Sequence, residues 1–168
     1  MKDITVIILT YNEELHIERC INNVSPFAKD IYIVDSFSKD NTVAIAERLG
    51  IKVFTNPFVN QAIQFQWGLD NCPIETEWVM RMDADEYIGP PLVDEIIQKI
   101  SLLEPDVNGI FLKRKHHFLG RWIKYGDRYP LVMLRIWRKG TAHIEQRWMD
   151  EHIILDSGKS VVFSGDFV

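Results

Sequence analysis

Apolar and polar residues alternate along the first two thirds of the chain in blocks that have the length of single strands and helices. Short runs rich in Val and Ile are typical of buried strands, and the longer segments between them carry apolar residues at helical spacing. The predicted strands are residues 4–9, 30–35, 51–55 and 77–83. The predicted helices are residues 13–24, 38–50, 60–71 and 92–103. We expect Asn12 to cap the first helix and Gly50 to end the second.

This order of elements predicts an α/β fold, in which right-handed crossovers build a mostly parallel central sheet flanked by helices. After about Pro105 the pattern changes to strand-like runs without clear helices between them, at residues 109–118, 131–137, 152–155 and 160–163. We therefore expect a mixed, more antiparallel second half.

With 168 residues the chain can bury one sizeable core, so we expect a single domain over residues 1–168. Residues 1–105 would form its nucleotide-binding part and residues 106–168 a second part. Since the sequence closes on SVVFSGDFV without a final helix or polar tail, we expect it to be truncated at the C-terminus.

Charge is unevenly divided along the chain, whose net value is -5. Residues 1–110 hold 8 Lys and Arg against 18 Asp and Glu, whereas residues 111–168 hold 11 against 6. The basic part is interleaved with aromatic residues between positions 111 and 129, a mixture suited to anionic lipid headgroups, phosphorylated substrates or nucleic acid. An ordinary solvated strand pair explains it equally well. The acidic first half and the pI near 5.5 oppose nucleic-acid binding.

Neither a membrane-spanning helix nor a signal-type region is visible in the sequence, because no apolar run approaches roughly 20 residues. We expect a cytoplasmic protein, with peripheral contact on the inner face of the cytoplasmic membrane as a further expectation. The two cysteines, Cys20 and Cys72, have no CxxC or metal-ligand spacing. They are predicted to be reduced packing residues.

Polar residues follow the four predicted strands at the points where these strands end. Open α/β sheets bind ligands beyond the carboxyl ends of their strands, so we expect these residues to converge on one site. Taken singly, Asn12 is explained as a helix cap and Asp35 as a turn residue, but their joint placement favours a site. The strand-end residues are Thr10, Tyr11, Asn12, Glu13, Asp35, Ser36, Asn56, Asp83, Ala84 and Asp85.

Two carboxylates, Asp83 and Asp85, lie one residue apart and would point to the same side of an extended segment. Close like charges are costly unless a cation neutralises them. Oxygen ligands without a Cys/His set favour Mg²⁺ or Mn²⁺ over zinc. Because the chain has neither a Walker loop nor a GxGxxG motif, we expect a nucleotide diphosphate to be bound through this metal.

These motifs and their order resemble glycosyltransferase family 2, whose members have the GT-A fold. The matching segments are VIILTYNEE at the first strand end, IVDSFSKDNT at the second and MDADE at the fourth. Within the family, the chain looks most like bacterial enzymes that build lipopolysaccharide core or other surface polysaccharides. The resemblance implies an inverting, metal-dependent transferase that moves a sugar from a nucleotide diphospho-sugar, with UDP the expected nucleotide, to a hydroxyl of a glycan or lipid-linked acceptor.

The resemblance also implies roles for single residues. Asp35 would accept a hydrogen bond from the base, and Asp83 would lie near the ribose and sugar. Asp85 would be the metal ligand for Mn²⁺ or Mg²⁺, with Asp83 as a further candidate. His152 lies two residues after Asp150 and could share its face, so it is another candidate ligand, with a structural hydrogen bond as the alternative. The implied nucleotide-sugar contacts are Thr10, Tyr11, Asn12, Glu13, Asp35, Gln66, Arg81, Asp83 and Ala84.

The general base of such enzymes is a carboxylate from the second half, and the segment RWMDEHI offers Asp150 and Glu151. Of the two, Asp150 is the expected base, which would take the proton of the acceptor hydroxyl. One departure concerns Phe65 and Gln66, which stand where relatives often carry Arg-Asn. Arg81 is a candidate to replace that Arg, and an ion pair within the sheet is its alternative.

Two other functions remain open at the level of sequence. A nucleotidyltransferase would share the α/β sheet and the paired carboxylates, but it would carry a glycine-rich basic loop after the first strand, where this chain has TYNEEL. A catalytically impaired nucleotide-binding fragment is the second alternative, and the presence of Asp83, Asp85 and Asp150 opposes it.

Overall fold

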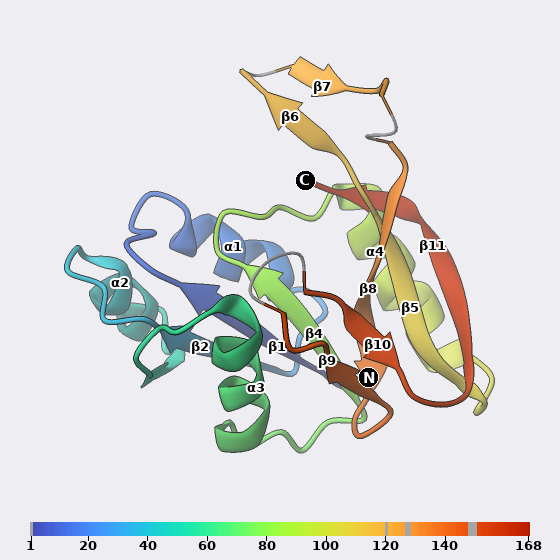
Figure 1. Cartoon of the computed structure of the whole chain (residues 1–168), viewed down its shortest axis with the longest axis horizontal. Helices are drawn as coiled ribbons and strands as arrows, with labels where there is room; N and C mark the ends of the chain where they lie inside the picture. Colours follow the sequence, from blue (N-terminus) through green and yellow to red (C-terminus); the bar gives the residue numbers. More distant parts are fainter. Residues whose placement is uncertain (1, 120, 127–128, 148–150) are drawn as a thin grey trace.

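The computed structural model describes residues 2–119, 121–126, 129–147 and 151–168. Its centre is a seven-stranded sheet with the strand order β11-β5-β8-β4-β1-β2-β3 (Figure 1). The strands are β1 (Ile4–Thr10), β2 (Asp30–Asp35), β3 (Lys52–Thr55), β4 (Trp78–Asp83), β5 (Val107–Arg114), β8 (Leu131–Arg138) and β11 (Lys159–Phe167).

Strands β1 to β4 run parallel to one another, whereas β8 is antiparallel to both of its neighbours, β4 and β5. Strand β11 pairs with β5 in parallel. The predicted α/β fold with a mostly parallel sheet and a mixed second half is therefore confirmed. All seven residues of β1 are buried, as expected of a strand that is covered on both faces.

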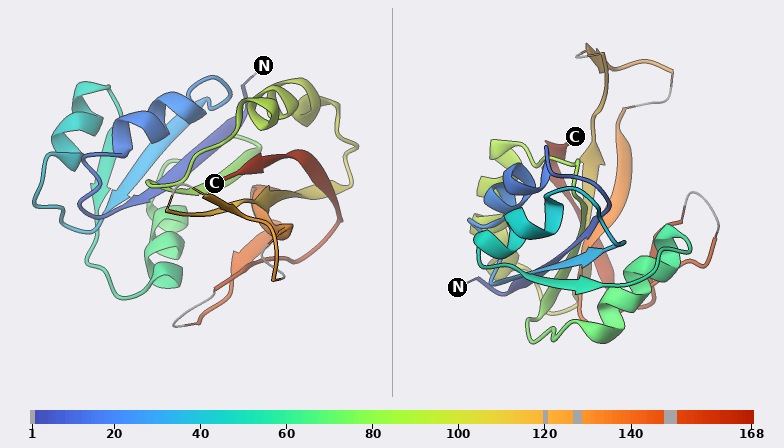
Figure 2. Two further views of the ribbon diagram at one scale, coloured as in Figure 1. Left: turned by 90° about the horizontal axis from the view of Figure 1, so that it is seen from above. Right: turned by 90° about the vertical axis from the view of Figure 1, so that its left-hand side faces the viewer.

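Helices cover both faces of the sheet (Figure 2). One face is covered by α1 (Ile17–Val24), α2 (Thr42–Arg48) and α4 (Pro90–Lys99), which is followed by the 3₁₀ turn η1 (Ile100–Leu102). The other face is covered by α3 (Gln61–Asn71) and by the two-stranded ribbon of β9 (Ala142–Ile144) and β10 (Ile153–Leu155). The sheet therefore separates two apolar cores.

The first helix begins later than its pattern predicts. Residue Asn12 adopts a left-handed backbone with φ 54, and its side-chain oxygen accepts a hydrogen bond from the Lys39 N–H instead of capping a helix. Helix α1 starts at Ile17. The second helix also begins later than predicted, at Thr42 instead of residue 38, but Gly50 ends it in the left-handed conformation as expected. The third helix agrees with its predicted range, and Asn60 caps it.

The second half contains elements that the pattern did not separate. The predicted strand 109–118 is divided into β5 and β6 (His116–Phe118), and β6 forms a hairpin with β7 (Arg121–Ile123). Both cysteines are free and buried, and burial raises the pKa of Cys20 to about 12 and that of Cys72 to about 11. Among the described residues, no helix has the length and apolar character needed to cross a membrane.

Candidate functional site

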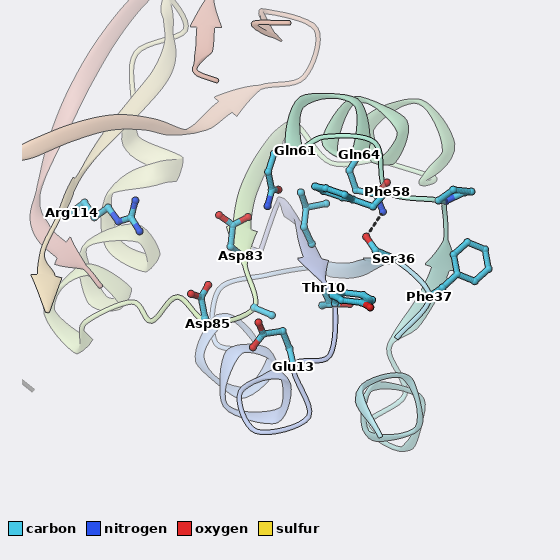
Figure 3. Close-up of a pocket in the computed structure, with 14 residues that line it drawn as sticks. Thr10, Glu13, Ser36, Phe37, Phe58, Gln61, Gln64, Asp83, Asp85 and Arg114 are labelled. Carbon is cyan, nitrogen blue, oxygen red and sulfur yellow. Dashed lines mark hydrogen bonds between the residues drawn. The ribbon is translucent and has the colours of Figure 1, made fainter. Parts of the chain in front are cut away.

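A cavity of about 780 Å³ opens at the carboxyl ends of β1 and β4 (Figure 3). It lies where parallel strands end, as the sequence predicted. Seven of the strand-end residues that are predicted to converge on one site line it, and besides the Ser36 named below they are Thr10, Tyr11, Glu13, Asp83, Ala84 and Asp85. The remaining lining residues are Leu9, Ser36, Phe37, Pro57, Phe58, Gln61, Gln64 and Arg114.

Two carboxylates reach this cavity through a turn at Asp83-Ala84-Asp85, which we call the DxD segment. Asp83 is the last residue of β4, and the Glu86 N–H donates to the Asp83 carbonyl at 3.0 Å. The chain therefore bends at Ala84 and Asp85, so the expectation of an extended segment is wrong. Both carboxylates nevertheless face the cavity, because the turn keeps them at the same strand end (Figure 3).

Glu86 connects this turn to the second half of the chain. Its Oε2 accepts the Asp83 N–H at 2.9 Å, and its Oε1 lies 2.6 Å from Nη2 of Arg135 on β8. Both side chains are buried. Burial raises the pKa of the Glu86 carboxyl, and the Arg135 guanidinium opposes that shift. The position of the DxD segment thus depends on a buried ion pair between residues far apart in sequence.

Arg81 connects the DxD segment to Glu151. Its Nη2 donates to Oε1 of Glu151 at 2.9 Å, and its Nε lies 3.6 Å from Oδ1 of Asp83. Burial lowers the pKa of Arg81, but the carboxylates of Asp83 and Glu151 outweigh this effect and raise it. The guanidinium also lies 5.4 Å from the ring centre of Phe65, in a cation–π contact.

Asp35 lies behind the wall of the cavity and does not line it. It is 1% exposed, and its carboxylate accepts hydrogen bonds from Oγ1 of Thr10 and from the N–H of Ser38, at 2.9 and 2.8 Å. It thus ties the end of β1 to the loop after β2. Its contact with a base stays a prediction, and Asn12, which holds Lys39, is not in the lining either.

Gln66 is not among the residues that line the cavity, and its contact with a nucleotide-sugar stays a prediction. Its amide donates to Asp70 on the surface of α3, whereas Gln61 and Gln64 line the cavity. Residues three apart share a helix face, while a residue two positions on is turned by about 200°. The face of α3 that meets the cavity is therefore that of Gln61 and Gln64, and Gln66 lies on another face.

Two exposed aromatic side chains at the mouth of the cavity, Phe37 and Phe58, were not predicted from the sequence. Phe37 and Phe58 are each more than half exposed, and Tyr11, which was predicted, joins them. Phe37 has a left-handed backbone with φ 63, which is uncommon for a bulky residue. Flat apolar faces in this position are suited to stacking on a planar ring such as a nucleobase.

The donor set of the cavity fits a divalent metal ion with oxygen ligands. Asp83 and Asp85 offer hard carboxylate oxygens, and Oδ1 of Asp83 is buried without a hydrogen-bond partner among the described residues. The described part of the chain gathers no group of three His, Cys, Asp or Glu residues around a metal position. Two carboxylates suffice for Mg²⁺ or Mn²⁺, which commonly complete their coordination with phosphate oxygens and water.

His152 is not brought to these carboxylates, so the predicted three-residue metal set is not assembled. Its Nδ1 lies 3.7 Å from Glu145, and its side chain is half exposed. His152 lines a second cavity of about 380 Å³, together with Arg81, Glu151 and apolar residues of β5, β8 and β10. Asp150, the expected general base, lies outside the described residues.

Residues 5–165 match the sequence model of a protein family, glycosyl transferase family 2. The chain belongs to this family. A protein of Rickettsia bellii named uncharacterized glycosyltransferase is 41% identical over 95 residues, and one of Rickettsia felis is 40% identical over 96. These matches cover 56% and 57% of this chain, but only 32% and 33% of the relatives. The matched region thus spans about a third of their length.

Solved structures confirm the GT-A fold. Glucosyl-3-phosphoglycerate synthase from Mycobacterium tuberculosis, in complex with Mn²⁺, UDP and its product, is 21% identical with a TM-score of 0.54, over 67% of this chain and 43% of that one. S. aureus TarS 1–349 in complex with UDP-GlcNAc is 23% identical with a TM-score of 0.54, over 74% and 37%. Family membership therefore rests on the family model, and the fold on these likenesses.

Proposed function

We propose that this domain transfers a sugar from a UDP-sugar to a hydroxyl of a glycan or lipid-linked acceptor, with Mn²⁺ or Mg²⁺ bound and with inversion at the anomeric carbon. The observation that carries the proposal is the joint placement of Asp83 and Asp85 in a cavity with exposed aromatic side chains at its mouth. The structurally similar proteins are recorded with UDP and Mn²⁺, or with UDP-GlcNAc, which supports this choice of donor.

In this proposal the first cavity binds the donor. Thr10 and Glu13 line the side of the cavity formed by the end of β1, and the aromatic rings of Tyr11, Phe37 and Phe58 offer faces for the base. A metal held by Asp85, with Asp83 beside it, would neutralise the diphosphate and ease its departure.

The second cavity is proposed to receive the acceptor. Arg81 lines this cavity, and its Nε lies 3.6 Å from Oδ1 of Asp83, which lines the first cavity, so the two cavities are neighbours. Glu151 lines the second cavity and is mostly buried. A hydroxyl entering there would approach both the Glu151 carboxylate and the donor.

Glu151 is proposed as the general base, with Asp150 as the neighbouring candidate that the sequence favoured. The Arg81 guanidinium donates a hydrogen bond to Oε1 of Glu151 at 2.9 Å, which holds this carboxylate at the wall of the second cavity. As the acceptor oxygen forms its bond to the anomeric carbon, the carboxylate takes the hydroxyl proton. The bond from that carbon to the diphosphate breaks in the same displacement, which inverts the configuration.

The remaining parts of the proposal concern the setting of the reaction. Residues 1–105 would supply most of the donor site, to which Arg114 adds, and residues 106–168 most of the acceptor site, to which Arg81 adds, within one domain. We propose a role in cell-surface polysaccharide synthesis, including lipopolysaccharide, carried out in the cytoplasm with peripheral contact to an anionic membrane. The uneven charge along the chain supports this setting, since the second half is basic.

Calorimetric titration of UDP with and without Mn²⁺ tests the donor site. We expect Mn²⁺ to raise the affinity for UDP, and we expect Asp85→Ala to weaken binding in the presence of Mn²⁺ by roughly tenfold to a hundredfold, because a metal ligand is lost. Asp94→Ala, which removes an exposed carboxylate on α4, is the matched control and should bind like the wild type. An affinity for UDP that is indifferent to both Mn²⁺ and Asp85→Ala would disprove metal-bridged donor binding.

A further inference from the structure

The hairpin of β6 and β7 projects from the body of the domain (Figures 1 and 2). Its strands pair with each other and form a sheet separate from the seven-stranded one. It follows directly after β5, whose last residue, Arg114, lines the donor cavity. The hairpin therefore rises from the same edge of the sheet at which that cavity opens.

Large apolar side chains are exposed on this hairpin and on the segment after it. Leu119 at the tip is 86% exposed and Tyr125 is 85% exposed, while Ile123 on β7 is exposed as well. A two-stranded hairpin has no core of its own in which to bury such residues. Single exposed apolar residues are ordinary, but several on one projecting element indicate an interaction surface.

The backbone at the tip strengthens this inference. The pairing of Phe118 with Arg121 leaves a two-residue loop, and Leu119 occupies it with a left-handed φ of 49. Loops of this kind favour Asn, Asp or Gly, because a larger side chain is strained there. A leucine at this position is unfavourable for the turn and is exposed to water, so the folded domain by itself does not explain it.

Positive charge surrounds these apolar residues. Between positions 113 and 128 the sequence has six Lys and Arg against one Asp, although the whole chain has a net charge of -5. Arg121 and Lys124 are exposed. The ammonium groups of Lys115 and Lys124 lie 4.8 and 4.3 Å from the ring centre of Trp122, on which the edge of Tyr129 also packs. The hairpin thus combines the aromatic ring of Trp122, cations beside it and the exposed apolar side chain of Leu119 at its tip.

We propose that this hairpin binds the surface of an anionic lipid bilayer, with Leu119 and Tyr125 in the interfacial region and Arg121 and Lys124 against the headgroups. Aromatic and aliphatic side chains with flanking cations match the layered polarity of that interface. The surface follows from the hairpin alone, while its purpose rests on the proposed function. A cavity held at the membrane would meet a lipid-linked acceptor there.

Flotation with vesicles of phosphatidylcholine, with and without phosphatidylglycerol, tests the proposal. We expect the wild type to float only with the anionic vesicles, and less as salt is raised. Leu119→Asn with Tyr125→Ser should weaken this binding while keeping the hairpin, because Asn suits the left-handed position. Arg121→Glu with Lys124→Glu should weaken it by on the order of tenfold or more. The matched control is Lys29→Glu with Lys52→Glu. These two lysines lie at the amino ends of β2 and β3, whereas the hairpin follows the carboxyl end of β5.

Two results would overturn the proposal. One is flotation of both hairpin variants to the same extent as the wild type. The other is absence of wild-type binding to anionic vesicles, including the case in which an anionic polysaccharide or RNA is bound instead. Titration of UDP into the same variants separates this test from that of the donor site, because an intact domain should retain wild-type UDP affinity whatever happens to vesicle binding.

Discussion

The two cavities are built in different ways. The donor cavity is held by contacts within and between short motifs of the first half, such as Asp35 with Ser38 and Asp40 with Thr42. The second cavity depends on contacts between residues far apart, since Arg81 meets Glu151 across 70 positions. The donor edge could therefore be predicted from sequence motifs, whereas the acceptor side emerges only when the sheet is assembled.

The two regions are joined at the DxD turn. Arg135 of β8 contacts Glu86, and Glu86 holds the N–H of Asp83. Arg135 of the second half thus supports the DxD segment of the first half through Glu86. The two regions therefore differ in whether nearby or distant residues in the sequence build them, and the site needs both regions.

The largest effect is expected for the proposed general base. Glu151→Gln keeps the shape of the side chain but removes its capacity to take a proton, so transfer should fall by about 10²- to 10⁴-fold. UDP affinity should stay near that of the wild type, because Glu151 lines the second cavity and not the first. Steady-state kinetics of transfer, together with calorimetric binding of UDP, provide the measurement.

Asp150→Asn is the companion variant for this comparison. If it abolishes transfer while Glu151→Gln remains active, the base is Asp150 and the sequence-based expectation holds. A loss of UDP affinity in Glu151→Gln would instead show that the two cavities are not functionally separate.

The next largest effect concerns the pair that joins the two regions. Arg135→Ala leaves the buried Glu86 carboxylate without its cation, so the free energy of unfolding should fall by about 3–5 kcal/mol in urea denaturation. Arg48→Ala, which breaks the exposed pair with Glu18 within the first half, should cost about 1 kcal/mol or less. Equal losses in both variants would contradict the view that Arg135 and Glu86 hold the DxD turn.

The smallest effect is expected at Asp35. Asp35→Asn weakens the contacts with Thr10 and Ser38, which should lower the free energy of unfolding by about 1–3 kcal/mol. UDP affinity should fall modestly, because Thr10 loses its partner. Asp70→Asn on the exposed side of α3 is the control and should change neither quantity. Strong loss of UDP binding at unchanged stability would show that Asp35 contacts the nucleotide directly.

Much of the fold could be predicted because strand and helix periods are local properties. The four parallel strands, the C-terminal end of α2 and the range of α3 agree with the pattern, and Gly50 ends α2 as expected. Helix α1 was extended too far, since its first residues had helical spacing while Asn12 adopted the left-handed backbone. That conformation is stabilised by Lys39, a partner outside the local window.

The site was predicted in part for the same reason. Asp83 and Asp85 were assigned correctly to the cavity, but through a supposed extended segment that is in fact a turn. The resemblance implies a contact for Gln66, but the helix face that lines the cavity is that of Gln61 and Gln64. His152 was predicted as a metal ligand because it lies two residues after Asp150. The fold places it at the second cavity.

The sequence by itself determined the order of strands and helices, the polar residues at the strand ends and the membership of a glycosyltransferase family. These features depend on local periodicity and on short motifs. Only the tertiary structure decided that Arg81 stands between Asp83 and Glu151, that Arg135 and Glu86 hold the turn, and that a basic, apolar-tipped hairpin rises beside the donor cavity. Such contacts join distant segments, and burial and charge pairing select them only when the whole sheet has formed.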